Sequence, residues 1–199
     1  MTRKLVLASG NKGKLKELSN LLEPLSIQLS TQNDYGVLDV DETGLSFVEN
    51  AILKARAVSK ASNLPALADD SGIEVDALQG QPGIYSARFS GEHGNDANNN
   101  QLLIEKLQHI AVEERTARYQ CVLVYMRHWQ DPTPLICQAA WEGSIGLSPK
   151  GENGFGYDPL FIPEGMDCTA AELDPNKKKQ LSHRAKALQL FTTQLALQV

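Results

Sequence analysis

Apolar side chains alternate between residues 119 and 127, and this alternation constrains the fold more than any other feature of the 199-residue chain. One set consists of Cys121, Leu123 and Tyr125, and the other of Val122, Val124 and Met126. A period of two is typical of a β-strand. A second strand pattern covers residues 135–141, after an Asp-Pro-Thr-Pro turn sequence at residues 131–134. The two strands are therefore expected to pair as a hairpin.

The remaining strand and helix patterns are mixed along the chain, without strict alternation. Short strands are predicted over residues 5–8 and 27–30, and helices over residues 46–61, 96–110 and 182–197. Such an order favours an α/β fold, a mixed β-sheet with flanking helices, in which the hairpin bends away as a second lobe. A central cleft between two lobes is a usual place for a small ligand.

Composition places the chain among ordinary globular proteins. Hydrophobic residues make up 42% and charged residues 22%, and this length favours one domain over residues 1–199. The formal net charge of −5 argues against a general binder of duplex nucleic acid, because that affinity rests on many Lys and Arg contacts to phosphate. A small anionic substrate stays compatible with a local basic site.

Cysteine usage and the hydropathy pattern bear on location. Cys121, Cys137 and Cys168 form no C-x-x-C pair and are odd in number, which disfavours a disulfide framework or a structural zinc site. No stretch has the pattern of a signal peptide or the length of a membrane span. We therefore expect a cytoplasmic protein with no membrane partner.

A loop of small and basic residues follows the first predicted strand and opens a helix. Its residues are Ser9, Gly10, Asn11, Lys12, Gly13 and Lys14. Exposed N–H groups at a helix start favour an anion, and glycines let the backbone approach a ligand closely. The loop is not a Walker A motif, because Leu15 replaces the Ser or Thr that binds magnesium. A tight turn with solvated lysines is the structural alternative, so this loop alone leaves phosphate binding open.

Two adjacent carboxylates, Asp69 and Asp70, follow an apolar run and precede Ser71 and Gly72. We expect two strand-like pieces on either side of this sequence, with the carboxylates at a strand end. Neighbouring strand residues point to opposite faces, so the pair divides its roles. Carboxylates are natural ligands of Mg²⁺, and one beside a metal could accept a proton from water. The alternative is an Asp-Ser-Gly turn.

A second acidic region precedes the helix at residues 46–61. Ser46 and Glu49 have the spacing of a capping box, which gives Glu49 a structural role. Glu42 has no such role and could complete a metal site with Asp70. A solvated charge run is the alternative for this loop.

The C-terminal part combines aromatic and basic residues. Phe155 and Tyr157 lie on a glycine-rich loop at residues 154–159, and aromatic faces stack well on nucleobases. Basic residues at 177–179 and at 183–184 crowd the start of the last predicted helix, where the helix dipole disfavours cations. A bound anion would explain this placement, and a solvated basic patch is the alternative.

Jointly, these four regions supply what an enzyme acting on a nucleoside polyphosphate needs: phosphate-binding backbone, metal-binding carboxylates, a stacking aromatic and cations. Two other functions remain open. One is a nucleotide-binding regulator without turnover, which would not need Glu42 and Asp70 together. The other is a pyrophosphatase for modified pyrimidine nucleotides, because stacking on Phe155 suits any base.

The sequence resembles the inosine triphosphate pyrophosphatase family, also called XTP/dITP diphosphatases. The resemblance covers nearly the whole chain and rests on seven motifs in order: residues 9–14, 42–44, 49–55, 68–72, 82–88, 154–159 and 182–184. It implies an elongated mixed α/β fold around a nucleotide-binding cleft, a homodimer, dependence on Mg²⁺, and a role in removing deaminated purine nucleotides such as ITP, dITP and XTP.

The resemblance also implies individual roles. Triphosphate contacts fall to Ser9, Gly10, Asn11, Lys12, Gly13, Lys14 and Lys54. Mg²⁺ ligation falls to Glu42 and Asp70, with Asp70 also the general base and Asp69 sharing metal or water contacts. Nucleotide and base contacts fall to Ser71, Phe155, Gly156, Tyr157, Asp158, Lys178, His183 and Arg184. The implied reaction is water attack on the α-phosphorus, which releases pyrophosphate.

Overall fold

The computed structural model describes residues 3–9, 15–16, 18–19, 22–38 and 40–197 of the chain. The predicted phosphate loop at residues 10–14 therefore lies outside the described residues, apart from Ser9. Among the described residues, no helix combines the length and the apolar character that crossing a membrane requires.

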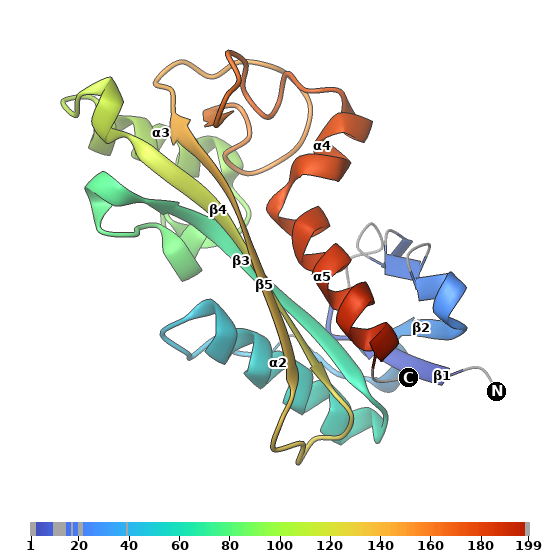
Figure 1. Ribbon diagram of the computed structural model, residues 1–199. Helices are drawn as coiled ribbons and strands as arrows, with labels where there is room; N and C mark the ends of the chain where they lie inside the picture. The colour runs from blue at the N-terminus through green and yellow to red at the C-terminus, as the bar shows by residue number, and fades with distance from the viewer. Residues whose placement is uncertain (1–2, 10–14, 17, 20–21, 39, 198–199) are drawn as a thin grey trace. The chain divides into compact units, whose positions relative to one another are not determined.

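A mixed sheet of six strands forms the centre of the fold (Figure 1). The strands are β1 (Arg3–Leu7), β2 (Ile27–Thr31), β3 (Ala66–Val75), β4 (Thr116–Met126), β5 (Leu135–Ile145) and β6 (Phe161–Pro163). Their order is β2-β1-β3-β4-β5-β6. β1 is parallel to both β2 and β3, with Leu5 opposite Leu29 and Leu7 opposite Leu67, whereas β5 and β6 are antiparallel. The mixed sheet predicted from the sequence is confirmed.

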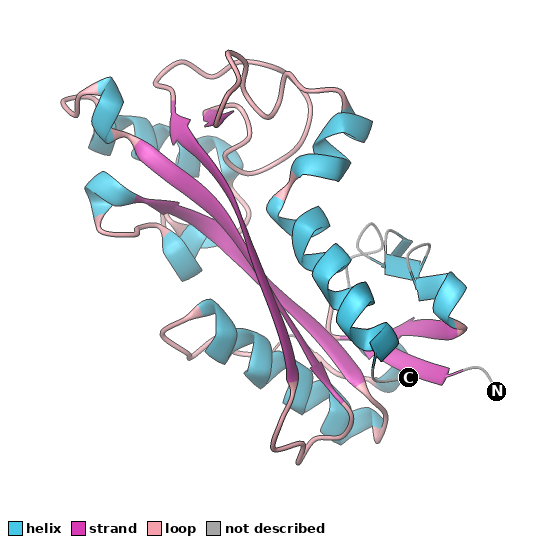
Figure 2. Ribbon diagram, viewed as in Figure 1, coloured by secondary structure: helices cyan, strands magenta, loops and turns pink. Residues whose placement is uncertain are grey.

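Helices flank this sheet, as the secondary-structure colouring of Figure 2 shows. They are α2 (Phe47–Ser62), α3 (Asp96–Leu107), α4 (Pro175–Leu181) and α5 (His183–Leu197). Helix α2 begins where the capping residues predicted, because the Ser46 hydroxyl accepts the Glu49 N–H. The Glu49 carboxylate accepts from the Ser46 hydroxyl and from the Leu45 N–H. In a standard capping box it would accept the N–H of the N-cap residue, here Ser46, so this bond is shifted by one residue.

The chain divides into two compact units, which are described separately. The first comprises residues 1–70, 122–138 and 187–199, and the second residues 71–121 and 139–186. In the first unit, β1 and the apolar face of α2 supply fully buried side chains such as Val6, Ala51 and Ala55. These side chains recur at the helical spacing that the sequence predicted for α2. Whether residues 1–199 form a single domain stays a prediction.

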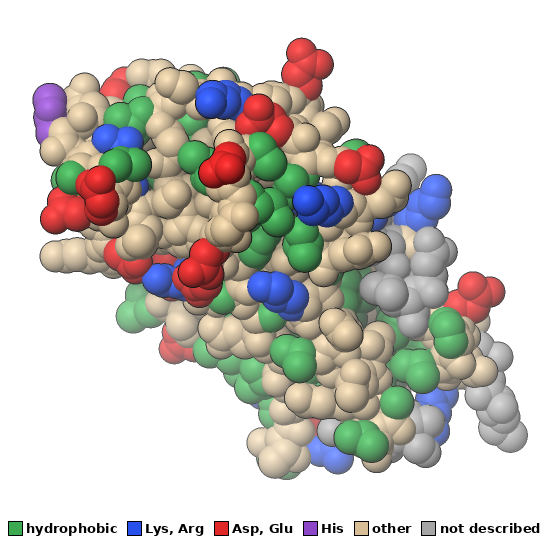
Figure 3. Space-filling model, turned by 45° about the horizontal axis from the view of Figure 1, so that its top comes forward, with side chains coloured by type: hydrophobic (Ala, Val, Ile, Leu, Met, Phe, Trp, Pro, Cys, Tyr) green, Lys and Arg blue, Asp and Glu red, His purple; other side chains and the backbone are tan. Residues whose placement is uncertain are grey.

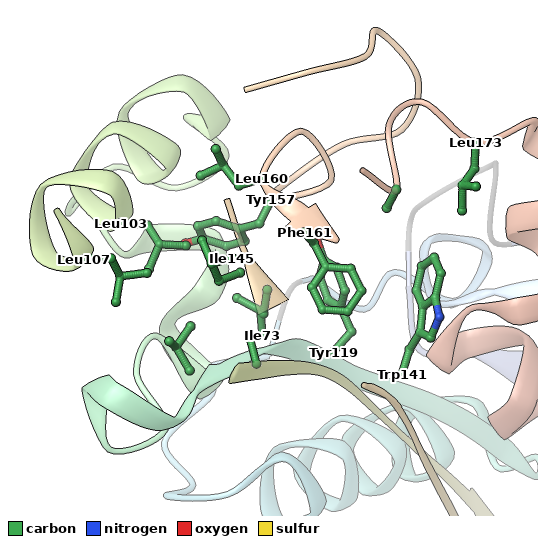
Figure 4. Packing of buried hydrophobic residues seen from close by; sticks show 13 residues of the cluster. Ile73, Leu103, Leu107, Tyr119, Trp141, Ile145, Tyr157, Leu160, Phe161 and Leu173 are labelled. Carbon is green, nitrogen blue, oxygen red and sulfur yellow. The ribbon is translucent and has the colours of Figure 1, made fainter. Parts of the chain in front are cut away.

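The core of the second unit is a cluster of buried apolar residues, shown in Figure 4. Strands β3, β4 and β5, helix α3 and the segment at residues 157–161 all contribute to it. Tyr119 meets Phe161 edge-on, with ring centroids 4.8 Å apart, and Trp141 lies 5.3 Å from the same ring. This aromatic packing holds β4, β5 and β6 together beneath the loop that carries Phe155.

Two local expectations are wrong. Residues 66–75 form one continuous strand, so Asp69 and Asp70 lie inside β3 and not at a strand end or in a turn. Full burial of Ala66, Leu67, Ala68, Ile73 and Val75 on both sides of the carboxylates outweighs the turn propensity of Asp-Ser-Gly. The three lysines at 177–179 belong to a separate short helix, α4, which Asp174 caps and Pro175 begins, and not to the last helix.

Surface charge is mixed on the face drawn in Figure 3. There the basic side chains stand singly or in small groups among acidic, apolar and other side chains. Among its described residues, the face drawn therefore carries no broad basic patch.

The hairpin connection between β4 and β5 is organised by one buried carboxylate. Asp131 accepts hydrogen bonds from the backbone N–H groups of Arg127 and Thr133, at 3.0 and 3.1 Å. Its carboxylate also pairs with the Arg127 guanidinium at 2.5 Å. Hydrogen bonding from Arg127 outweighs desolvation and holds the pKa of Asp131 well below its usual range.

We expect Asp131→Ala to destabilise the protein at pH 7 by about 1–3 kcal/mol, because two backbone N–H groups lose their acceptor. The folded-state pKa is depressed, so this stabilisation is present above pH ~4 and is lost as the pH falls toward the folded-state value. Urea unfolding midpoints at pH 7 and pH 3 test this, with Asp167→Ala as an exposed acidic control. A difference between wild type and variant that is equally large at both pH values would contradict it.

Candidate functional site

Most of the described residues that the sequence singled out fall into two groups, one in each unit. Glu42, Lys54 and Asp70 form the carboxylate–lysine group of the first unit. Ser71, Phe155, Asp158, Lys178, His183 and Arg184 form the aromatic–basic group of the second unit. Strand β3 carries Asp70 and Ser71 in consecutive positions, so the chain itself joins the two groups.

In the carboxylate–lysine group, one ammonium meets two carboxylates. Lys54 Nζ lies 2.9 Å from Glu42 Oε1 and 2.7 Å from Asp70 Oδ1. The three side chains are 15%, 27% and 10% exposed, respectively, so water screens the contacts only partly. Lys54 comes from α2, Asp70 from β3 and Glu42 from the loop before α2. Packing of α2 beside the sheet therefore brings together residues that are 12 and 16 positions apart.

Asn50 holds the loop that carries Glu42. Its side chain is completely buried, and its Oδ1 accepts the Gly44 N–H at 2.8 Å. A Cβ on residue 44 would lie 2.6 Å from the Glu49 Cβ and 2.8 Å from Asn50 Oδ1, so only glycine fits here. Asn50 is one helical turn before Lys54, on the same face of α2. The loop and the lysine are thus positioned by the same helix, a role for Asn50 that no sequence pattern indicated.

Charges within the group perturb two pKa values. Burial raises the pKa of Asp70 to about 6, against the attraction of Lys54 and with the repulsion of Glu42 and Asp69. Burial acts to lower the pKa of Lys54, but attraction to Asp70, with smaller contributions from Asp69 and Glu42, outweighs it and raises that pKa. Lys54 therefore stays cationic, and its positive charge offsets the negative charges of Asp70, Asp69 and Glu42.

The donor set of this group fits a hard divalent cation. Glu42 and Asp70 direct carboxylate oxygens at a single cationic centre, the Lys54 ammonium. Mg²⁺ is usually held by one or two carboxylates together with substrate phosphates and waters. Within the described part of the chain, no cluster of three or more His, Cys, Asp or Glu residues is arranged to hold a metal. Two protein carboxylates can thus hold a divalent cation that takes its other ligands from water and substrate oxygens.

In the aromatic–basic group, the buried Asp158 carboxylate connects three neighbours. Oδ2 accepts the Phe155 N–H at 2.7 Å and pairs with Lys178 Nζ, and Oδ1 accepts the Tyr119 hydroxyl at 3.4 Å. Gly154 has a φ of +85° and packs against this ion pair, where a Cβ would collide with the Asp158 carboxylate. The ion pair distinguishes Lys178 from its neighbours Lys177 and Lys179, which are exposed.

Phe155 is the exposed aromatic of this group, with 64% of its surface accessible. Two cations face its ring: Lys178 Nζ lies 5.2 Å and Arg184 Cζ 6.0 Å from the ring centroid. An exposed aromatic ring beside fixed cations can stack on a planar base while the cations contact its polar edge.

His183 and Arg184 begin α5 and make different contacts. The His183 ring stacks on Tyr119, with centroids 4.8 Å apart and an angle of 10° between the planes. Arg184 Nη2 donates to Ser71 Oγ at 3.4 Å, so it links the start of α5 to β3. Tyr119 thus contacts both His183 and Asp158, although its sequence position indicated only a strand residue.

Three other predicted residues lie elsewhere in this arrangement. Tyr157 is 3% exposed and donates its hydroxyl to Ser86 O at 2.8 Å, so it is a core residue and not a second exposed aromatic. Gly156 follows Phe155 with its backbone bonded to α3. Asp69 is 6% exposed and precedes Asp70 in β3. The triphosphate contacts predicted for Gly10, Asn11, Lys12, Gly13 and Lys14 lie outside the described residues.

Comparison with known proteins places this arrangement in a family. A Photobacterium profundum protein named dITP/XTP pyrophosphatase is 56% identical over 187 residues, which are 94% of each chain. A Vibrio parahaemolyticus protein of the same name is 50% identical over 98% of each chain. The solved structure of a HAM1 protein from Coxiella burnetii matches 98% of each chain with a TM-score of 0.94 and 46% identity. The model of the Ham1 family matches residues 5–194. The resemblance inferred from the sequence motifs is thereby confirmed, and this chain belongs to the Ham1 family.

Proposed function

We propose that this protein hydrolyses non-canonical purine nucleoside triphosphates, namely ITP, dITP and XTP, to the monophosphate and pyrophosphate. The observation that carries the proposal is the convergence of Glu42 and Asp70 on Lys54, in a chain with an exposed Phe155 between cations. The relatives named dITP/XTP pyrophosphatase match over nearly their full length and support the same reaction. Its cellular role would be to keep deaminated purines out of the nucleotide pool.

Residues of the first unit bind the phosphates of the substrate in this proposal. Glu42 and Asp70 would hold Mg²⁺, which supplies charge neutralisation on the polyphosphate and lowers the pKa of bound water. Asp70 accepts the proton of the water that attacks the α-phosphorus. Lys54 lies between both carboxylates and contacts phosphate, and the loop at residues 9–14 holds the triphosphate. Asp69 shares contacts to metal or water.

The aromatic–basic group binds the base of the nucleotide. Phe155 stacks on the base, Lys178, His183 and Arg184 contact its edge, and Ser71 contacts the nucleotide. Gly156, Tyr157 and Asp158 shape the pocket through the loop backbone and its core anchor. Arg184 can only donate hydrogen bonds, so it pairs with the 6-keto oxygen of hypoxanthine or xanthine and not with the 6-amino group of adenine. Guanine shares that keto oxygen, so this contact selects against adenine alone.

We further propose that the chain acts as a homodimer of single pyrophosphatase domains in the cytoplasm, with no nucleic-acid or membrane partner. The resemblance to the inosine triphosphate pyrophosphatase family supports the dimer. The net charge of −5 supports the absence of a duplex nucleic-acid partner.

A pyrophosphate-release assay over ITP, dITP, XTP, ATP, GTP and dUTP tests the function. We expect turnover of the first three, and expect Asp70→Asn to lower kcat by about 10²–10⁴-fold because the general base is lost. At saturating Mg²⁺, substrate affinity should change little, since the asparagine keeps the size of the aspartate and one oxygen ligand. Near wild-type turnover of Asp70→Asn would show that Asp70 is not the base, and preference for dUTP would favour a pyrimidine nucleotide pyrophosphatase.

Metal dependence has a separate test. EDTA should abolish ITP hydrolysis, and added Mg²⁺ should restore it. Glu42→Gln should raise the Mg²⁺ concentration for half-maximal activity by about tenfold or more, since even indirect partners of a metal contribute that much. Asp41→Asn is the matched control, because it removes an exposed carboxylate from the same loop. An equal shift in both variants would show an effect of net charge and not of ligation.

Base selection is tested by Arg184→Ala. Loss of a charged hydrogen bond, worth about 1.5–3 kcal/mol, should narrow the ITP-to-ATP ratio of kcat/KM by roughly ten- to a hundredfold. Lys179→Ala removes an exposed cation of α4 and should leave the ratio as it is in wild type. An unchanged ratio in Arg184→Ala would exclude this residue from reading the base.

A further inference from the structure

Helix α3 holds the backbone of the loop that carries Phe155. Asp96 Oδ2 accepts the Gly156 N–H at 2.6 Å, and Asn100 Nδ2 donates to the Gly156 carbonyl at 2.8 Å. Both polar groups of Gly156, whose φ is +64°, are therefore bonded to one helix. Asp96 and Asn100 are four positions apart, so they lie on the same helical face.

These contacts fix the backbone on both sides of Phe155. The Phe155 N–H is held by Asp158 Oδ2, and the N–H of the following peptide unit is held by Asp96. The ring itself is 64% exposed, so burial does not fix it. Its direction therefore depends on the flanking peptide units, which the two carboxylates hold, and on the two cations that face the ring.

Core packing joins α3 to residues 157–161, which follow Phe155, whereas the hydrogen bonds to Gly156 hold the part of the loop next to the ring. A pocket of about 450 Å³ lies there, lined by α3 residues such as Asp96 and Asn100 and by loop residues including Phe155 and Pro159. The helix end is well defined, because the Asn95 side chain caps it by accepting the Asn98 N–H at 3.1 Å. Asn100 is 9% exposed and also donates to Asp96 O at 2.7 Å.

We propose that Asp96 and Asn100 are positioning residues that set nucleobase affinity by fixing the direction of Phe155. The inference rests on the proposed function, in which Phe155 stacks on the base. Both residues bond to the Gly156 backbone, so their proposed role acts through Phe155 and not through reacting atoms. Replacing either residue should therefore weaken binding of the base. It should leave the proton transfer and the contacts to the phosphates unchanged.

Asp96→Ala is the informative variant. It should raise KM for ITP and the Kd for IMP by about tenfold each, equivalent to about 1.4 kcal/mol, while kcat stays within about twofold. Asp96→Asn retains an oxygen acceptor for the Gly156 N–H and should recover part of the affinity. Asp167→Ala, which removes an exposed acid elsewhere in the same unit, should bind IMP as wild type does.

A double-mutant cycle separates positioning from a general structural role. In a Phe155→Ala background the ring is absent, so adding Asp96→Ala should not weaken IMP binding further. Asn100→Leu gives a second variant that removes the bond to the Gly156 carbonyl, and melting temperatures show whether each variant is folded.

Wild-type KM and Kd in Asp96→Ala would overturn the inference, as would full additivity with Phe155→Ala. A fall in kcat and melting temperature at unchanged KM would overturn it too, because it indicates a merely structural role. If the wild-type protein neither hydrolyses ITP nor binds IMP, the proposed function itself fails. If wild type does both and Asp96→Ala matches it, only the positioning role fails.

Discussion

In the first unit, the central interaction is the ion pair between Lys54 and the buried Asp70 carboxylate of β3. Asp70 lies in the middle of β3, where burial disfavours its charge. Lys54 provides the nearby cation, and Glu42 shares it. Helix α2 supplies both Lys54 and Asn50, and Asn50 holds the loop that carries Glu42. The same ionic contacts bring together two carboxylates, the type of ligand that hard divalent cations prefer.

The second unit solves a similar problem in a different way. Asp158 is buried beneath its loop and is compensated by Lys178, while its remaining capacity fixes the Phe155 backbone and the Tyr119 hydroxyl. One carboxylate thus places a cation, an exposed ring and a core tyrosine together. The two units share the pairing of one buried aspartate with one lysine.

Local patterns in the sequence predict the elements well, but they do not predict the contacts between elements. The hairpin, α2 and its cap follow from periodicity and capping chemistry, because both signals are local. The continuity of β3 was missed because Asp-Ser-Gly favours a turn locally, whereas burial on both faces favours the strand. Asn50 and Tyr119 carry no local signal, since each acts through a partner that is distant in sequence or on another turn. The motifs named Phe155, the carboxylates and Lys178 as candidates, but they do not contain the contacts that these side chains make in the structure.

The register of β3 has a consequence for how this chain can vary. Leu7 lies opposite Leu67, so Asp69 and Asp70 are two and three residues beyond a fixed pair. Because side chains alternate along a strand, inserting one residue between 67 and 69 would exchange the faces to which the two aspartates point. Lys54 would then meet the wrong carboxylate. A change in length is therefore not tolerable in the first half of this strand.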